Sequence, residues 1–152
     1  MSIKPWVDYF LDLAKTCASR SNCLRANVGA VIVGADKTIK ATGYNGTPSK
    51  VESCAERGEC FRVKNNIPSG TRYETCRSIH AEQNAIIQAG QDRCKGSTMY
   101  IWGHDFVCIL CQRFIVQSGI REVYLRKDEN SPIVKVSTED LRKQLEEQPQ
   151  LV

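Results

Sequence analysis

The chain has 152 residues, of which 41% are hydrophobic and 25% are charged, and its formal net charge is +4. This length and composition predict one globular domain over residues 1–152 with a core of its own, and no internal repeat suggests a second. The mild positive charge fits a small anionic ligand, and no run of Lys and Arg is long enough for a nucleic-acid arm. Charges at Lys4, Asp8 and Asp12 interrupt the N-terminal segment, so we expect a cytoplasmic protein without a signal peptide or membrane span.

Hydrophobic periodicity predicts alternating helices and strands. Apolar residues at three- and four-residue steps indicate a first helix over 4–18, with one apolar face made of Trp6, Tyr9, Phe10, Leu13 and Cys17. The later elements are expected at 28–33 (strand), 38–42 (strand), 79–89 (helix), 98–102 (strand), 108–118 (helix), 122–126 (strand), 133–136 (strand) and 138–147 (helix). This alternation predicts an α/β protein with a mixed sheet that helices cover on both faces.

Residues 43–78 form a loop insert without a long periodic segment. The insert opens with turn chemistry at 43–48 and contains Cys54, Cys60 and Cys76. A loop of this length in a compact domain is usually functional or held in place. The chain has eight cysteines, and without a signal peptide these favour metal ligation over disulfides, with buried free thiols as the alternative.

Three residues have the spacing of a catalytic zinc site. His80 falls near the start of its predicted helix, and Cys108 and Cys111 fall in the first turn of theirs, where two residues three apart share a face. Zinc takes nitrogen and sulfur donors in tetrahedral geometry and leaves the fourth position to water in catalytic sites. Glu82 is about 200° around the helix from His80, which suits a proton carrier better than a ligand. The alternatives for Cys108 and Cys111 are a redox-active cysteine pair or half of a structural zinc knuckle.

The same residues form the motif His-x-Glu followed by Cys-x-x-Cys, which is typical of zinc nucleobase deaminases, although Val107 replaces the usual proline. Nearly the whole chain resembles the cytidine deaminase superfamily, and more closely the deoxycytidylate (dCMP) deaminases. The segments that carry this resemblance, in the family's order, are 20–23, 28–33, 43–46, 76–86 and the Cys108/Cys111 helix.

The resemblance implies a three-layer α/β/α sandwich with a five-stranded mixed sheet. It implies hydrolysis of dCMP to dUMP and ammonia, which supplies the precursor of dTMP. In this reading His80, Cys108 and Cys111 bind Zn²⁺, and Glu82 moves protons from water to N3 and to the leaving amine. Asn45 would contact the substrate sugar, and the Ala81 backbone would hold the edge of the base.

The resemblance also carries expectations about regulation and structure. It implies a homo-oligomer, commonly a hexamer, with dCTP and dTTP as effectors near Gly43, Tyr44 and Gly46. Some relatives hold a second, structural zinc in the long insert, and six cysteines are left over here, of which Cys17 lies on the apolar face of the first helix. The hypothesis is a site made by some of Cys23, Cys54, Cys60 and Cys76.

Two parts of the substrate site are less defined. The segment 100–108 is about two residues longer than in the family, so Trp102, His104 or Phe106 is expected to shape the base pocket, unless Trp102 is core and His104 is solvent-exposed. The 5′-phosphate needs cationic or N–H donors. We prefer Arg25 and Asn27 for it, and the other candidates are Arg20, Lys50, Arg62 and Arg126.

Three other functions compete with this interpretation. One is deamination of another cytosine or purine nucleoside or nucleotide, and another is editing of a polynucleotide. An editor would need a broad basic surface, which the mild charge disfavours. The third is a non-catalytic zinc-containing nucleotide-binding protein, in which Glu82 would have no task.

Overall fold

The computed structural model describes residues 2–148, so residues 1 and 149–152 of the expected domain lie outside the described part. Five strands form one sheet in the order β2-β1-β3-β4-β5. β3 and β4 are parallel, and the other neighbours are antiparallel, so the sheet is mixed as predicted. The strands are β1 (Gly29–Val33), β2 (Ile39–Tyr44), β3 (Thr98–Trp102), β4 (Glu122–Arg126) and β5 (Val134–Ser137).

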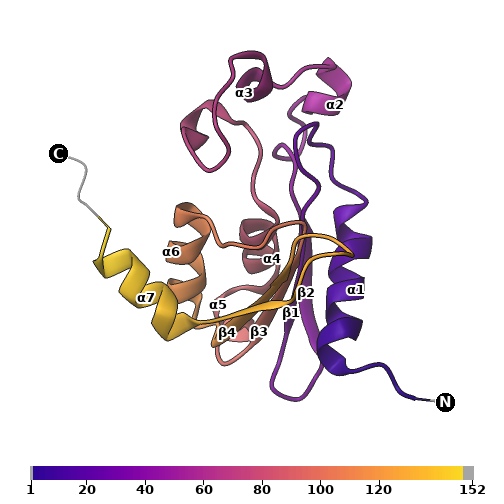
Figure 1. Ribbon diagram of the computed structural model, residues 1–152, viewed down its shortest axis with the longest axis vertical. Coiled ribbons are helices and arrows are strands. Elements are labelled where there is room, and N and C mark those ends of the chain that lie inside the picture. Colours follow the sequence, from indigo (N-terminus) through magenta and orange to yellow (C-terminus); the bar gives the residue numbers. More distant parts are fainter. Residues whose placement is uncertain (1, 149–152) are drawn as a thin grey trace.

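Helices cover both faces of this sheet, which confirms the three-layer α/β/α arrangement (Figure 1). One face is covered by α1 (Trp6–Ala18). The helices on the other side are α4 (Ala81–Ala89), α5 (Gln91–Cys94), α6 (Ile109–Ser118) and α7 (Thr138–Glu146), of which α7 packs against α6. No helix within residues 2–148 has both the length and the apolar character needed to cross a bilayer.

The two central strands separate two hydrophobic cores. β1 and β3 are buried at all five positions, because helices lie on both of their faces. Val31 and Tyr100 point into the core beneath α1, whereas Ile32 and Ile101 point into the core beneath α4 and α6. Side chains that alternate across a strand therefore serve both layers, as expected for a sheet in the middle of a sandwich.

The apolar face predicted for α1 is partly wrong. Phe10 is fully buried, but Trp6 and Tyr9 are 53% and 42% exposed. The side of the helix against the sheet is made of Phe10, Leu11, Ala14 and Ala18. Small residues face the sheet because α1 lies very close to β1, where a Cβ on Gly29 would stand 1.9 Å from the Ala14 carbonyl oxygen.

A second glycine brings α4 against the other face. A Cβ on Gly43 of β2 would stand 2.4 Å from the Ala81 carbonyl oxygen and 2.6 Å from the Ala85 backbone nitrogen. Glycine is thus required at this close approach of strand and helix. Because α4 begins at the candidate metal ligand His80, this contact also sets the position of the site.

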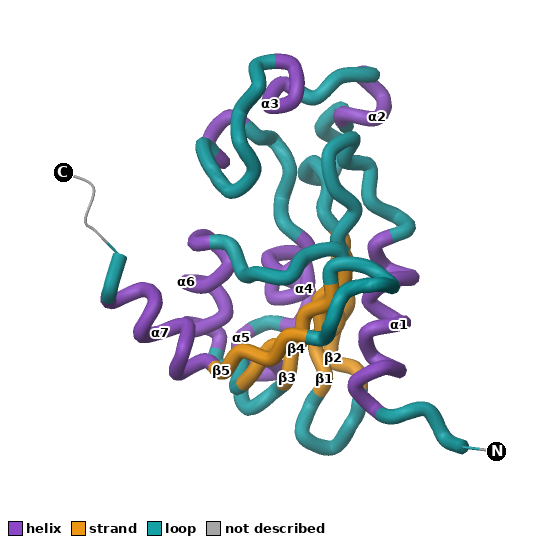
Figure 2. The backbone as a smooth tube through the Cα atoms, viewed as in Figure 1, coloured by secondary structure: helices purple, strands orange, loops and turns teal. Residues whose placement is uncertain are grey.

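The insert at 43–78 lies beyond one end of the sheet and is mostly loop (Figure 2). It contains three one-turn helices that the sequence analysis did not predict, α2 (Cys54–Arg57), α3 (Phe61–Lys64) and the 3₁₀ helix η1 (Tyr73–Thr75). A capping box of Ser53 and Glu56 holds α2. An isolated bridge between Gly46 and Ile79 joins the two ends of the insert.

Candidate metal centre and active-site cavity

The candidate ligands lie where two helices begin. His80 is the N-cap residue of α4, and Cys108 is the N-cap residue of α6. The backbone N–H of His80 donates to Gln83 Oε1 at 2.9 Å, and the backbone N–H of Cys111 donates to Cys108 Sγ at 3.4 Å. Each helix start is therefore fixed by a local hydrogen bond. The free backbone N–H groups at the start of α6 favour negative charge on the Cys108 and Cys111 sulfur atoms.

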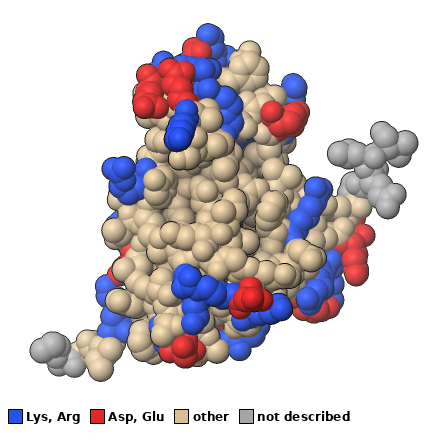
Figure 3. All heavy atoms as spheres, turned by 180° about the vertical axis from the view of Figure 1, so that it is seen from behind, with Lys and Arg blue, Asp and Glu red and all other residues tan. Residues whose placement is uncertain are grey.

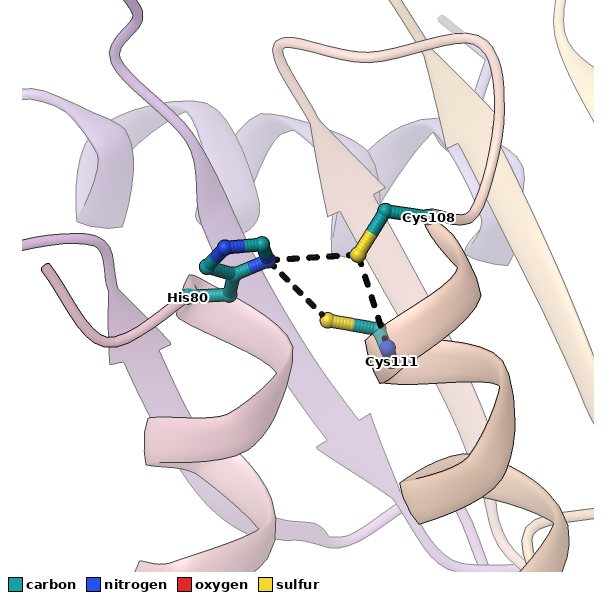
Figure 4. Close-up of side chains that lie close together, drawn as sticks. All are labelled: His80, Cys108 and Cys111. Carbon is teal, nitrogen blue, oxygen red and sulfur yellow. Dashed lines mark hydrogen bonds between the residues drawn. The ribbon is translucent and has the colours of Figure 1, made fainter. Parts of the chain in front are cut away.

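The three side chains point toward one another (Figure 4). His80 Nδ1 lies 3.3 Å from both Cys108 Sγ and Cys111 Sγ. Ligands at ordinary Zn–N and Zn–S bond lengths in a tetrahedron would be separated by about 3.6 Å. Within residues 2–148 this is the one group of three or more His, Cys, Asp or Glu side chains whose ligand atoms all lie within 4.8 Å of one another. The donor set and its spacing therefore fit zinc.

The electrostatics of the pair of cysteines favour a metal ligand. The hydrogen bond with Cys111 is the largest cause that lowers the pKa of Cys108, which falls to about 4, and His80 adds to it. The same hydrogen bond, together with burial, raises the pKa of Cys111. Burial opposes a charged imidazole at His80, but the Cys108 thiolate and Glu82 outweigh it and raise the pKa of His80. The site therefore holds a thiolate at neutral pH, the form that binds metal.

Glu82 lies beside the ligands and is not one of them. Its side chain is buried, with 3% exposed, and its Oε2 lies 3.6 Å from Cys111 Sγ. Burial raises the pKa of Glu82 above its ordinary value. A carboxyl group with a raised pKa, next to a metal position and facing a cavity, is suited to accept a proton and to return it.

A cavity of about 180 Å³ opens at this centre. Several residues predicted for the substrate site line it, namely His80, Ala81, Glu82, Cys108, Asn45, Arg25 and His104. Asn45 also forms two hydrogen bonds to the backbone of the cavity wall. Its Oδ1 accepts from the Val28 N–H at 2.9 Å, and its Nδ2 donates to the Ala26 carbonyl at 2.7 Å. An amide nitrogen has two N–H groups, so one is left for a ligand.

Other predicted substrate residues do not reach this cavity. Asn27 is exposed and is not among the residues that line the cavity. Trp102 is buried in the core next to α1 with Lys15 and Arg126 against its ring, and Phe106 is 42% exposed. Three of the phosphate candidates are also outside the lining, namely Arg20, Lys50 and Arg126.

The four cysteines predicted for a second metal site, Cys23, Cys54, Cys60 and Cys76, lie around two neighbouring cavities. Cys23 and Cys76 line the cavity described above, whereas Cys54 and Cys60 line a smaller neighbouring cavity of about 70 Å³ that Cys76 also borders. Burial is the largest cause that raises the pKa of Cys54, with Cys60 and Cys23 as further causes. The thiols are thus neighbours, but within residues 2–148 they do not form a group at ligand spacing.

The residues expected at the effector site lie elsewhere. Gly43, Tyr44 and Gly46 line an open groove of about 520 Å³ beside α4, and the groove is separate from the cavity at His80. Asn84 from α4 also lines this groove, and its Nδ2 donates to the Tyr44 carbonyl at 2.8 Å.

The sequence analysis did not single out Tyr73, Ser69, Gly70 or Ser78, all of which line the cavity. The Tyr73 ring lies against the His80 ring, with centroids 4.9 Å apart. Burial raises the pKa of Tyr73 to about 12, so its hydroxyl stays protonated. No periodic pattern marks these residues, and only their position in a long insert could have drawn attention to them.

Comparison with known proteins identifies the family. Residues 4–127 match the family described as "Cytidine and deoxycytidylate deaminase zinc-binding region". The chain belongs to the cytidine and deoxycytidylate deaminase family. Because this family region binds zinc, the predicted cofactor is confirmed.

Relatives with measured similarity support the same assignment. The chain is 40% identical over 118 residues to a deoxycytidylate deaminase of Schizosaccharomyces pombe, covering 78% of this chain and 36% of that protein. It is 34% identical over 132 residues to one of Mycobacterium phage D29, covering 84% of this chain and 99% of that protein. The chain therefore spans little more than a third of the yeast relative but nearly all of the phage relative.

A solved structure agrees in fold as well. The dCMP deaminase of cyanophage S-TIM5, crystallised with dCMP and dUMP, has a TM-score of 0.62 and 27% identity, with 95% of each chain covered. This likeness confirms the cytidine deaminase-like α/β fold that the resemblance implied.

Proposed function

We propose that the protein is a zinc-dependent deoxycytidylate deaminase that hydrolyses dCMP to dUMP and releases ammonia, and so supplies the precursor of dTMP. The observation that carries this proposal is the convergence of His80 Nδ1 with the sulfur atoms of Cys108 and Cys111 at 3.3 Å, beside a buried glutamate. A structural zinc site would be closed by a fourth protein ligand, whereas this one opens on a cavity.

In the proposed mechanism His80, Cys108 and Cys111 hold the metal, whose Lewis acidity would acidify a water molecule. Glu82 would accept one proton from water as the water oxygen forms a bond to C4 of the pyrimidine, and would pass this proton to N3. It would then take the remaining proton from the new C4 hydroxyl and deliver it to the exocyclic amine, so that the C4–N4 bond breaks, ammonia leaves and a carbonyl remains at C4. The raised pKa of Glu82 suits both directions of transfer.

Other residues of the cavity would orient the nucleotide. The free N–H of Asn45 is available to the sugar, and the backbone at Ala81, at the start of α4, is available to the edge of the base. His104 enters the cavity from the long segment before Cys108, so it would shape the base pocket in place of Trp102 and Phe106. Arg25 also lines the cavity and would bind the 5′-phosphate.

The surface charge favours a free nucleotide over a polynucleotide. On the face seen in Figure 3, the charged side chains form several small groups, most of which contain both basic and acidic residues. These groups surround a broad uncharged area. A polynucleotide editor would instead need a continuous basic surface. The relatives named above as deoxycytidylate deaminases support the same choice.

The proposal extends to assembly and regulation. By family resemblance the protein would be a cytoplasmic homo-oligomer, commonly a hexamer, with dCTP and dTTP as effectors. The groove lined by Gly43, Tyr44 and Gly46 offers room for such an effector outside the cavity at His80.

The experiment that tests the function is ammonia release by the zinc-loaded protein from four substrates: dCMP, dCTP, deoxycytidine and cytosine. We expect dCMP to have the highest kcat/KM. Equal rates with dCMP and deoxycytidine would indicate a nucleoside deaminase. Zinc binding without turnover of any of the four substrates would contradict the proposed deaminase activity.

A further inference from the structure

Arg62 is a buried cation in an insert whose other charged side chains are exposed. It lies in α3, it is 7% exposed, and it lines the cavity at His80. One of its nitrogens, Nη2, donates to the carbonyls of Pro68 and Thr71 at 3.2 and 2.8 Å. These bonds hold the guanidinium in place without neutralising its charge.

Two nitrogens at this cavity are buried without a partner. They are Nε of Arg62 and Nη1 of Arg25. Among the ion pairs formed within residues 2–148, none involves either arginine. Arg62 is buried and Arg25 is half-buried. Burying a charged nitrogen without a counter-ion is costly, so two unpartnered guanidinium nitrogens at one cavity indicate that an anion completes the site.

We propose that Arg62 is a specificity-determining residue that selects a nucleotide with a 5′-phosphate, acting together with Arg25. Planar guanidinium groups match phosphate oxygens with paired hydrogen bonds, which suits a dianionic phosphate better than a neutral sugar hydroxyl. This inference rests on the proposed function and replaces the exposed Asn27 as the second phosphate contact.

Arg62 is also linked to the metal end of the cavity. Its guanidinium carbon lies 5.0 Å from the centroid of the Tyr73 ring, and that ring lies 4.9 Å from the His80 ring. A phosphate held by Arg62 would therefore fix the insert, through Tyr73, over the base. Phosphate recognition would be connected to the position of the base relative to Glu82.

The test compares the binding of dCMP and deoxycytidine to the zinc-loaded protein by isothermal titration, with kcat and KM measured in parallel. For Arg62→Gln we expect dCMP affinity to fall about 10- to 100-fold, the range typical of a charge-assisted hydrogen bond, while deoxycytidine affinity stays unchanged. The matched control is Arg57→Gln, since Arg57 is an exposed arginine of the same insert that pairs with Glu52 at 3.0 Å. This variant should bind both ligands like the wild type.

Equal losses for dCMP and deoxycytidine, or no loss for dCMP, would overturn the proposal, because they would give Arg62 a structural role or none. If Arg62→Gln does not fold, Arg62→Lys supplies the test, since it keeps the charge but lacks the paired donors. It should then show a smaller loss that is again confined to dCMP, and an equal loss for both ligands would again overturn the proposal. Failure of the proposed function is distinguishable, because a protein without turnover can still be titrated with dCMP.

Discussion

Glu82 Oε2 lies 3.6 Å from Cys111 Sγ, so the one buried carboxyl group of the cavity touches the ligand group without belonging to it. The two residues come from the first turns of α4 and α6, whose starts lie side by side. The arrangement leaves the position next to the three ligands open to the cavity, with a proton acceptor at its edge.

Replacing Glu82 by Gln should separate metal binding from proton transfer. Glutamine keeps the shape but cannot carry a proton, so we expect zinc content to stay near the wild-type value and kcat to fall about 10²- to 10⁴-fold. Zinc analysis and ammonia release measure the two effects. Glu139→Gln, on the exposed face of α7, is the control and should change neither. A Glu82→Gln variant with a near wild-type rate would refute the role of Glu82.

Removal of a ligand should abolish metal binding. We expect wild-type protein to contain one zinc per chain and Cys108→Ser to contain far less, because three ligands leave no redundancy. Cys60→Ser is the matched control, since Cys60 lies outside the group at ligand spacing and should keep the full zinc content. Two zinc ions in the wild type, with one lost in Cys60→Ser, would restore the second metal site that the insert cysteines suggested.

The raised pKa of Glu82 has a consequence for stability. Above its ordinary pKa of 4.5, the folded chain keeps a proton on Glu82 that the unfolded chain releases. The free energy of unfolding contributed by this group is therefore lost as pH rises through the folded pKa. Since Gln does not titrate, metal-free Glu82→Gln should gain stability over metal-free wild type as the pH rises above 4.5. Urea unfolding at three pH values measures the difference in free energy of unfolding between the variant and the wild type. A difference that shrinks as the pH rises would disagree with the burial of Glu82.

The contact between β2 and α4 predicts a strong effect of one methyl group. In Gly43→Ala the new Cβ would meet backbone atoms of α4, which cannot rotate away, so we expect a loss of about 1–3 kcal/mol in the free energy of unfolding. Because α4 also carries His80 and Glu82, kcat/KM should fall too. Gly34→Ala meets only the side chains of Lys40 and Asp36 and serves as the control. Equal stability of the two variants would contradict the close approach.

The regular elements could be predicted from the sequence because their patterns are local. All nine predicted helices and strands are present, and their ends agree to within two residues. The face of α1 could not be predicted correctly, because large apolar residues fit the helical period equally well on either side. Which side faces the sheet depends on Gly29, a residue of another element that allows α1 to approach closely.

The ligand set could be predicted from spacing, whereas the substrate end of the cavity could be predicted only in part, since Arg62 was one of several phosphate candidates and Tyr73 was not singled out. His80, Cys108 and Cys111 are each tied to the start of a helix, which the sequence marks. Arg62 and Tyr73 reach the cavity only because hydrogen bonds within the insert fold it back over the site. The capping box of Ser53 and Glu56 was a local signal in the insert that the sequence analysis did not use.

The central claim is the identity of the ligands around the metal, and X-ray absorption at the zinc edge tests it most directly. For the protein loaded with one zinc per chain, we expect two sulfur atoms at about 2.3 Å and two lighter atoms at about 2.0–2.1 Å, from His80 and a water molecule. A shell of four sulfur atoms would contradict this account, because it would assign the metal to Cys23, Cys54, Cys60 and Cys76 and leave His80 and Glu82 without a role.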